Sequence, residues 1–216
     1  MGENPARIDL GRVVAVTLFA IMLSVNAVRL AGTHPLSHPL SAITTVLTMA
    51  FYVLLIWAYL RRSPSTRTDL RWSSWLVAFL GTGAPFAIPL VSRDGFREGG
   101  SLAGIAAVVL CLGLAAMLWA LGALGTNISV VPQAREVISH GPYSLVRHPL
   151  YAAELLNVVG LCLATTGPGP WVVAGALVVF QVLRARREEA LLLNELPGYA
   201  AYKERTPMLV PAFGRS

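Results

Sequence analysis

The stretch GPYSLVRHPLY, residues 141–151, lies where a polar loop enters an apolar helix. A second charged cluster, Arg186 to Glu189, follows the next apolar segment. Between the two clusters lies an apolar hairpin, whose corner is the turn-forming sequence Gly-Pro-Gly-Pro at residues 167–170. Two charged clusters separated by one hairpin lie on the same side of a membrane, where together they can form the wall of a site for a polar ligand.

The whole chain has the composition of an integral membrane protein. Of its 216 residues, 55% are hydrophobic and 13% are charged, and the mean hydropathy is +0.63. A helix needs about 20 apolar residues to cross the hydrocarbon core. The apolar stretches are residues 13–30, 42–60, 75–91, 102–124, 149–165 and 171–183. We therefore predict an all-α membrane bundle of about six hydrophobic helices plus a cytoplasmic C-terminal helix. The last two stretches form the short hairpin, and their length leaves open whether they span the membrane fully.

The basic residues indicate the orientation of this bundle. Of the 17 lysines and arginines, only Arg29, Arg93 and Arg97 fall on the predicted outer side. The positive-inside rule therefore predicts that both termini and both charged clusters face the cytosol. The net charge of +6 does not indicate a nucleic-acid partner, because the basic residues lie in the connections and not on one soluble face.

We predict a single domain with two functional parts. Residues 1–124 form a scaffold of four transmembrane helices, and residues 125–216 form the cofactor-binding region of loop, hairpin and C-terminal helix. Cys111 and Cys162 lie inside apolar segments, so we interpret both as packing residues. His34 and His38 are four residues apart, but two prolines exclude the continuous helix that would align them as metal ligands. We expect no metal site.

The Arg-His-Pro sequence forms the entrance of a helix. Pro149 suits the first helical position, where its missing N–H costs nothing. The first-turn amides of a helix are unpaired and carry partial positive charge, so with Arg147 and His148 they can hold an anionic group. An interfacial Arg-His pair that contacts lipid phosphates explains the same residues equally well.

The next helix carries Tyr151, Glu154 and Asn157 three residues apart, and we expect them to share one face. An ionisable group at membrane depth costs about 2.5–3.5 kcal/mol on insertion scales unless it meets a partner or a wet cavity. We interpret Glu154 as a cavity-lining residue, and a structural hydrogen bond to a neighbouring helix is the alternative.

The segment from Arg184 to Glu189 continues the last apolar helix out of the membrane. Arg184 and Glu188 are spaced for an ion pair, as are Arg186 and Glu189. Successive residues point about 100° apart on a helix, so at most one of the two glutamates shares a face with Arg184. The other is then able to meet a ligand.

Three motifs resemble the isoprenylcysteine carboxyl methyltransferase and phospholipid methyltransferase superfamily of integral membrane enzymes: GPYSLVRHPLY, REEALLL at residues 187–193 and the tail YAAYKERTPMLVP at residues 199–211. The resemblance covers about the last two fifths of the chain. It implies S-adenosylmethionine bound between the RHPxY loop and helix and the helix with paired glutamates. One departure is Gly198, which directly precedes Tyr199, whereas relatives often have two residues between them. The residues that the resemblance assigns to the cofactor are Tyr143, Arg147, His148, Pro149, Leu150 and Tyr151, with Glu188 or Glu189 as the acidic partner.

The resemblance also implies the reaction, which is methyl transfer to a lipophilic acceptor entering from the bilayer. An isoprenylcysteine-type carboxylate is the first expectation, and a phospholipid amine or a thiol are the others. Arg184 and Arg187 are candidates for orienting the acceptor. Displacement at a methyl group needs alignment and exclusion of water more than a proton relay. An ammonium acceptor must lose a proton, for which Glu154 or Glu189 is a candidate base. Membrane lipids are the other expected partners.

Two other functions fit parts of this pattern. One is an NADPH-dependent reductase of the sterol-reductase type, whose C-terminal membrane region looks similar; the chain has no GxGxxG fingerprint, but such reductases bind their cofactor between helices. The other is a non-enzymatic carrier or assembly factor. Two features argue against a carrier. The polar residues are concentrated at the inner face and in one hairpin, and the sequence shows no pair of broken helices in corresponding halves of the chain, as many carriers have.

Overall fold

The structure is a computed structural model that describes residues 10–32, 39–61, 67–68, 87–94, 97, 99–124, 133–134 and 137–211. Within these ranges the chain forms six α-helices and two short 3-10 helices. The α-helices are α1 (Leu10–Ala31), α2 (Pro39–Leu60), α4 (Ser101–Leu124), α5 (Pro149–Ala164), α6 (Gly169–Glu195) and α7 (Tyr199–Arg205), and the 3-10 helices are η2 (Pro89–Val91) and η4 (Gly141–Ser144). Strands β1 (Arg67–Thr68) and β2 (Gln133–Ala134) pair antiparallel.

The described helices agree with most of the predicted apolar segments. Two of them, Ala42–Leu60 and Ser101–Leu124, are long and apolar enough to cross a membrane, and Ala15–Val28 and Pro149–Ala164 are shorter apolar helices. The predicted third span, residues 75–91, lies outside the described residues as far as residue 86, and η2 lies at its end. The β1–β2 pair was not predicted, because two-residue strands leave no periodic signal in the sequence.

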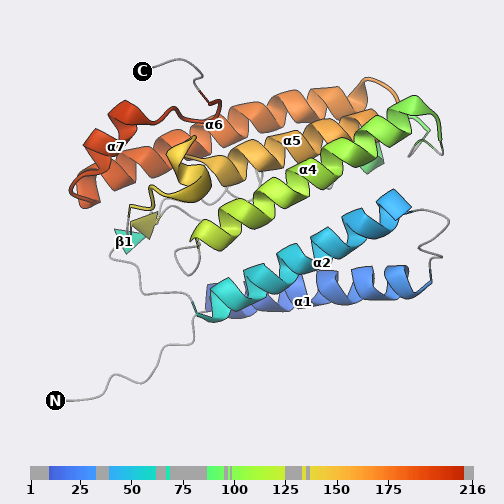
Figure 1. Ribbon diagram of the computed structural model, residues 1–216, viewed down its shortest axis with the longest axis horizontal. Coiled ribbons are helices and arrows are strands. Elements are labelled where there is room, and N and C mark those ends of the chain that lie inside the picture. Colours follow the sequence, from blue (N-terminus) through green and yellow to red (C-terminus); the bar gives the residue numbers. More distant parts are fainter. Residues whose placement is uncertain are drawn as a thin grey trace.

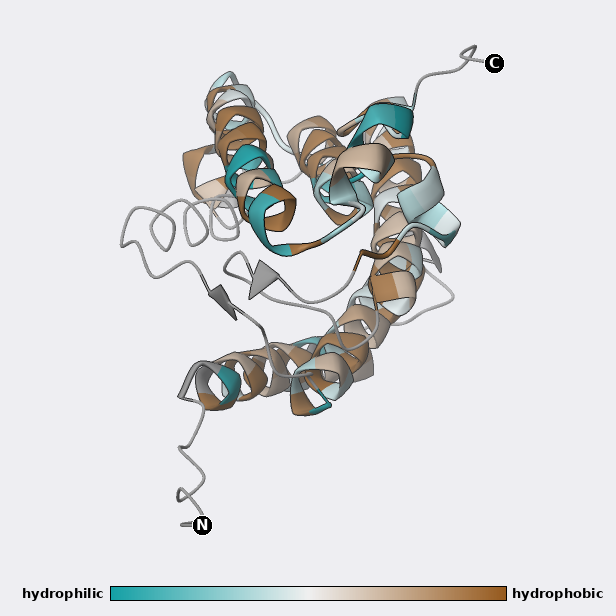
Figure 2. Ribbon diagram, turned by 90° about the vertical axis from the view of Figure 1, so that its left-hand side faces the viewer, coloured by the Kyte–Doolittle hydropathy of each residue, from teal (hydrophilic) through white to brown (hydrophobic). Residues whose placement is uncertain are grey.

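The helices form a curved row, in which each packs on the next in the order α1, α2, α4, α5 and α6. One end of the molecule brings together several helix ends (Figure 1). They are the starts of α1 and α5 and the ends of α2, α4 and α6, and α7 lies beside them. Hydrophilic residues gather at this end, which faces the viewer in Figure 2. The two charged clusters, at the start of α5 and the end of α6, therefore lie at the same end of the molecule.

Two glycines allow α4 and α5 to pack closely. A Cβ atom on Gly113 of α4 would lie 2.7 Å from Cγ of Asn157, and one on Gly160 of α5 would lie 2.8 Å from Cγ of Leu110. Small residues of this kind let membrane helices approach each other closely. The contact fixes α5, and with it the helix entrance at Pro149, against the scaffold.

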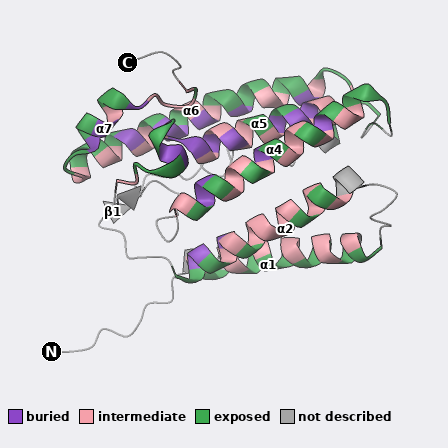
Figure 3. Ribbon diagram, viewed as in Figure 1, coloured by how far each residue is buried: buried purple, intermediate pink, exposed green. Residues whose placement is uncertain are grey.

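Buried side chains are concentrated in the second half of the row. One cluster of buried residues joins α2 to α4, through Leu55, Ala58, Tyr59 and Leu121, and another consists of Ile88, Val158, Cys162 and Leu177. Figure 3 shows that burial is greatest in α5, in η4 and towards the C-terminal end of α6. Large apolar side chains are exposed along α1, α2 and α4, which is the surface that a lipid environment requires.

Replacement of Gly113 by alanine tests the α4–α5 contact. We expect Gly113→Ala to destabilise the fold by about 1–3 kcal/mol, because the added methyl group overpacks against Asn157. Gly104→Ala on the same helix is the matched control, since a Cβ there meets nothing within 4 Å. Thermal unfolding in detergent measures both. Adding Asn157→Ala to Gly113→Ala should restore stability, and no recovery would contradict this account of the contact.

Candidate functional site

The residues before α5 are fixed by the C-terminal tail. Pro149 occupies the first turn of α5, and His148 is the residue that precedes it with a non-helical backbone. The backbone N–H of Arg147 donates to the carbonyl of Pro207 (2.8 Å), and that of His148 donates to the carbonyl of Met208 (3.1 Å). The tail thus holds both side chains at the entrance of the helix.

Glu189 is the centre of the site. Its side chain is almost fully buried, yet its two oxygens contact three basic groups. Oε1 accepts from Nε of Arg147 at 2.7 Å and from Nε2 of His148 at 3.2 Å, and Oε2 lies 3.0 Å from Nζ of Lys203. Arg147 also donates to the carbonyls of Lys203 (2.9 Å) and Thr206. One carboxylate therefore joins α6, the loop before α5, and α7.

These contacts keep Glu189 ionised. Burial alone would raise its pKa, but the hydrogen bonds from His148, Arg147 and Lys203 outweigh burial and lower the pKa from 4.5 to about 2. The spacing of Arg186 and Glu189 in the sequence predicts an ion pair between them on the same helix. In the structure Arg186 is exposed, and Glu189 points towards residues of other elements.

The second glutamate, Glu188, lies beside an aromatic residue. The hydroxyl of Tyr151 donates to Oε2 of Glu188 at 2.6 Å, and Nδ1 of His148 lies 3.8 Å from the same oxygen. The rings of His148 and Tyr151 stack at 5.3 Å with an interplanar angle of 4°. The guanidinium of Arg184 lies 4.7 Å from the centroid of the Tyr151 ring. The two glutamates thus face different partners, as their angular separation predicts.

A buried polar pair lies deeper between α5 and α6. Nε2 of Gln181 donates to Oε2 of Glu154 at 2.5 Å. Gln181 is fully buried, Glu154 is half-buried, and the charges of Glu154 and Glu188 both act on Arg184. Glu154 thus makes the hydrogen bond to a neighbouring helix that the sequence left open as the alternative to a cavity-lining role.

The prediction that Asn157 shares the face of Tyr151 and Glu154 was wrong. Nδ2 of Asn157 contacts Sδ of Met117 on α4 at 3.0 Å and donates to the carbonyl of Ala153 at 3.1 Å. Six residues turn a helix through about 600°, so residues 151 and 157 point about 120° apart. Gly113 leaves the space that Asn157 fills.

The remaining predicted residues occupy different surroundings. Tyr143 is buried, and its carbonyl accepts from the hydroxyl of Tyr202 at 2.7 Å. Leu150 packs against the α2–α4 cluster. Arg187 is half-buried on α6. The structure brings together Arg147, His148, Tyr151, Arg184, Glu188, Glu189 and, one helical turn deeper, Glu154.

Two residues of this site were not predicted from the sequence. Lys203 lies within the tail motif, but nothing in the motif shows that it contacts Glu189. Gln181 left a clearer signal, because it is the only polar side chain in the apolar stretch 171–183. A lone amide at membrane depth requires a partner, and Glu154 is that partner.

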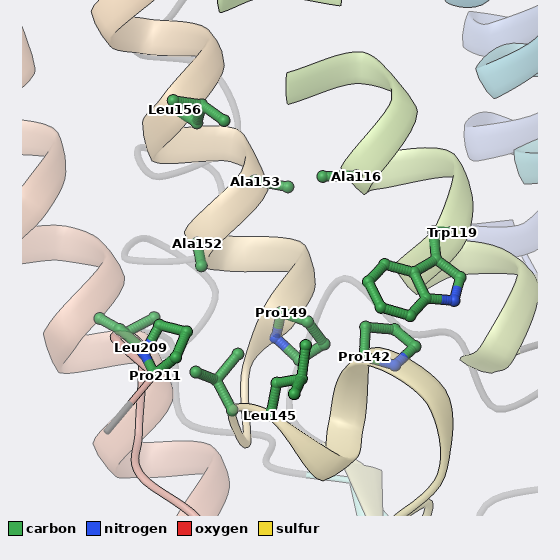
Figure 4. Close-up of a pocket in the computed structure, with 11 residues that line it drawn as sticks. Ala116, Trp119, Pro142, Leu145, Pro149, Ala152, Ala153, Leu156, Leu209 and Pro211 are labelled. Atoms are coloured by element: carbon green, nitrogen blue, oxygen red, sulfur yellow. The ribbon is translucent and has the colours of Figure 1, made fainter. Parts of the chain in front are cut away.

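An apolar pocket of ≈ 190 Å³ lies at the start of α5, where Pro149 is part of its lining (Figure 4). Its walls come from α4, η4, α5 and the tail. The lining residues are Ala116, Trp119, Pro142, Leu145, Val146, Pro149, Ala152, Ala153, Leu156, Leu209 and Pro211. The polar cluster and an apolar pocket therefore share the start of α5.

Metal ligands do not gather in the part of the chain that the structure describes. No group of three or more His, Cys, Asp and Glu side chains there can hold a metal ion. His34 and His38 lie outside the described residues.

Residues 101–196, which contain α4, α5 and α6, match the sequence model of the family described as phospholipid methyltransferase. The match confirms the superfamily resemblance seen in the sequence. Together with the two long apolar helices, it supports a membrane-associated methyltransferase in general.

Two curated proteins are similar to part of the chain. The cobalt-zinc-cadmium resistance protein CzcN of Cupriavidus metallidurans is 32% identical over 111 residues, which is 44% of this chain and 50% of that protein. The nickel-cobalt-cadmium resistance protein NccN of Alcaligenes xylosoxydans xylosoxydans is 31% identical over 112 residues, 45% of this chain and 52% of that protein. The chain thus spans about half the length of the curated relatives it matches.

The ion pairs of Glu189 predict an acid-sensitive fold. Since folding lowers the pKa of this group from 4.5 to about 2, its stabilising contribution is complete above about pH 4.5 and is lost as the pH falls towards 2. Glu189→Gln should remove this part of the acid dependence and destabilise the fold at neutral pH by about 3–5 kcal/mol, because it leaves buried charges without a partner. Thermal unfolding as a function of pH measures both effects. Glu204→Gln, at an exposed position of α7, is the control and should keep the wild-type dependence.

Proposed function

We propose that the protein is an S-adenosylmethionine-dependent methyltransferase that acts in a membrane on a lipophilic acceptor. The observation that carries the proposal is the cluster of Arg147, His148, Tyr151, Glu188 and Glu189. It is built at the start of α5 and the end of α6, within the region that matches the methyltransferase family.

The donor set of this cluster suits S-adenosylmethionine, which carries a carboxylate, an ammonium group, a sulfonium and a ribose diol. Arg147 offers a guanidinium and His148 a ring nitrogen for the carboxylate. Glu188 offers an accepting group for the ammonium or the ribose, and its side chain is 29% exposed, against 3% for Glu189. We therefore assign Glu188 as the direct acidic partner, while Glu189 holds Arg147 and His148 in place.

The bound cofactor would supply an electrophilic methyl group on sulfur, with a neutral thioether as the leaving group. The residues of this chain align the reactants and exclude water. Pro149 and Tyr151 are buried at the start of α5 and limit access of solvent from that side. Arg184, held against Tyr151, and Arg187 are positioned on α6 to orient the polar part of the acceptor. Alignment of the two reactants and exclusion of water are what methyl transfer requires from the protein.

The apolar part of the acceptor would lie in the pocket beside Pro149. All of its lining side chains are apolar, and Leu156 and Trp119 at its edge are exposed on the surface that faces lipid in our proposal. An acceptor in the bilayer could thus enter laterally. We further propose that this end of the molecule faces the cytosol, because the basic residues of the described loops and helix ends concentrate there.

Calorimetric titration of the detergent-purified protein with S-adenosylmethionine and S-adenosylhomocysteine tests this function. We expect both ligands to bind, and Glu188→Gln to weaken binding at least about 10-fold, because a lost hydrogen bond to a charged group costs about 1.5–3 kcal/mol. Glu204→Gln should bind as the wild type does. If folded protein binds neither ligand but binds NADPH, the reductase function replaces this one.

A further inference from the structure

The Glu154–Gln181 pair differs from the other polar contacts of the site. Gln181 is fully buried between α5 and α6, and its Nε2 donates to Glu154. Glu154 itself is half-buried as a residue. It lies one helical turn below Tyr151, on the side that faces α6.

One atom of this pair has no partner. Among the described residues, Oε1 of Gln181 is buried without a hydrogen bond, which is a costly state for an acceptor. The two ends of an amide can exchange by rotation about its last side-chain bond. Nε2 serves an ionised Glu154 as donor, and after rotation Oε1 can serve a protonated Glu154 as acceptor. Gln181 is therefore able to hold Glu154 in either protonation state.

The three carboxylates of the site have different hydrogen-bond partners. Glu189 contacts Arg147, His148 and Lys203, and its pKa of about 2 makes it a very weak base. Glu188 accepts a hydrogen bond from the hydroxyl of Tyr151 at 2.6 Å. Glu154 is hydrogen-bonded to a neutral amide and has Arg184 and Tyr151 as its charged and titratable neighbours. Glu154 is the carboxylate best arranged to take up a proton.

We infer that Glu154 is the general base that deprotonates the methyl acceptor, and that Gln181 is its positioning residue. This inference rests on the proposed methyltransferase function. An N–H bond of a lipophilic ammonium, or the S–H bond of a thiol, breaks, and its proton forms an O–H bond with Glu154. The electron pair stays on nitrogen or sulfur, which becomes the nucleophile. Glu154 later releases the proton to water.

The same arrangement indicates the class of acceptor. A carboxylate acceptor is already nucleophilic and needs no base, and it would lie against the negative charge of Glu154. An acceptor that carries a proton on the attacking atom uses both Glu154 and the adaptable amide behind it. We therefore expect a lipophilic amine or thiol as substrate, in place of the carboxylate that the sequence resemblance placed first.

Glu154→Gln is the decisive variant, because it keeps the shape of the side chain and removes the base. Its new amide can donate to the unpartnered Oε1 of Gln181, so we expect an unchanged or higher Tm without any ligand. S-adenosylmethionine binding by calorimetry should stay within about twofold of the wild type. Turnover of phosphatidylethanolamine or of a long-chain alkyl thiol should fall about 10²–10⁴-fold, the usual contribution of a general base.

Gln181→Met tests the positioning role, because methionine keeps the volume but cannot hydrogen-bond to Glu154. Without the N–H donor the ionised form of Glu154 is less stable, so the acid limb of the kcat–pH profile should move to higher pH. A merely structural role would lower Tm and leave this limb in place. Glu204→Gln again serves as the control.

The outcomes separate this inference from the function on which it rests. A wild-type protein that binds no S-adenosylmethionine overturns both. Normal cofactor binding with unchanged turnover in Glu154→Gln overturns only the role of Glu154. Methylation of a prenylcysteine carboxylate, with none of the amine or the thiol, overturns the assigned acceptor class.

Discussion

The buried carboxylate of Glu189 is the constraint on which the rest of the site depends. A charge removed from water costs several kcal/mol unless it is paired and hydrogen-bonded. Glu189 meets this requirement only if the loop before α5 supplies Arg147 and His148 and α7 supplies Lys203. The tail then follows, because Arg147 also needs the carbonyls of Lys203 and Thr206. One glutamate thus determines how three separate segments meet.

The scaffold contributes by fixing where this meeting takes place. Close packing of Gly113 against Asn157 and of Gly160 against Leu110 sets the position of α5 on α4. Leu150 continues this contact into the α2–α4 cluster. Since Pro149 begins α5 immediately after His148, any shift of the helix along α4 would move His148 away from Glu189. Apolar packing and the buried ion pairs therefore support each other.

The sequence was sufficient for the parts of this structure that local patterns encode. The hairpin corner at residues 167–170, the helix start at Pro149 and the continuation of α6 through Glu189 all depend on neighbouring residues, and all are present. The partners of the two glutamates could not be predicted. The sequence of a helix gives the angle between two side chains, but it does not give the rotation of the helix about its own axis. Asn157 shows the same limit, since its orientation follows from a glycine on another helix. Lys203 lies on α7 and its ammonium group contacts Glu189 on α6, so only the tertiary structure shows this ion pair.

The polar groups between α5 and α6 change character with depth, and this gradient gives the site two functions. At the outer end of α6, Glu189 contacts Arg147, His148 and Lys203 and stays ionised, which suits the binding of charged groups. Next, the partly exposed Glu188 accepts a hydrogen bond from the buried Tyr151. Deepest, Glu154 is held by a neutral amide that tolerates a carboxylate or a carboxylic acid. Contacts with basic side chains therefore decrease along this path, from Arg147, His148 and Lys203 around Glu189 to a hydrogen bond from a neutral amide at Glu154. A ligand with permanent charges therefore belongs at the outer end, and an ammonium group that must give up a proton belongs at the inner end, where the apolar surroundings of the bundle favour the neutral amine over the charged ammonium.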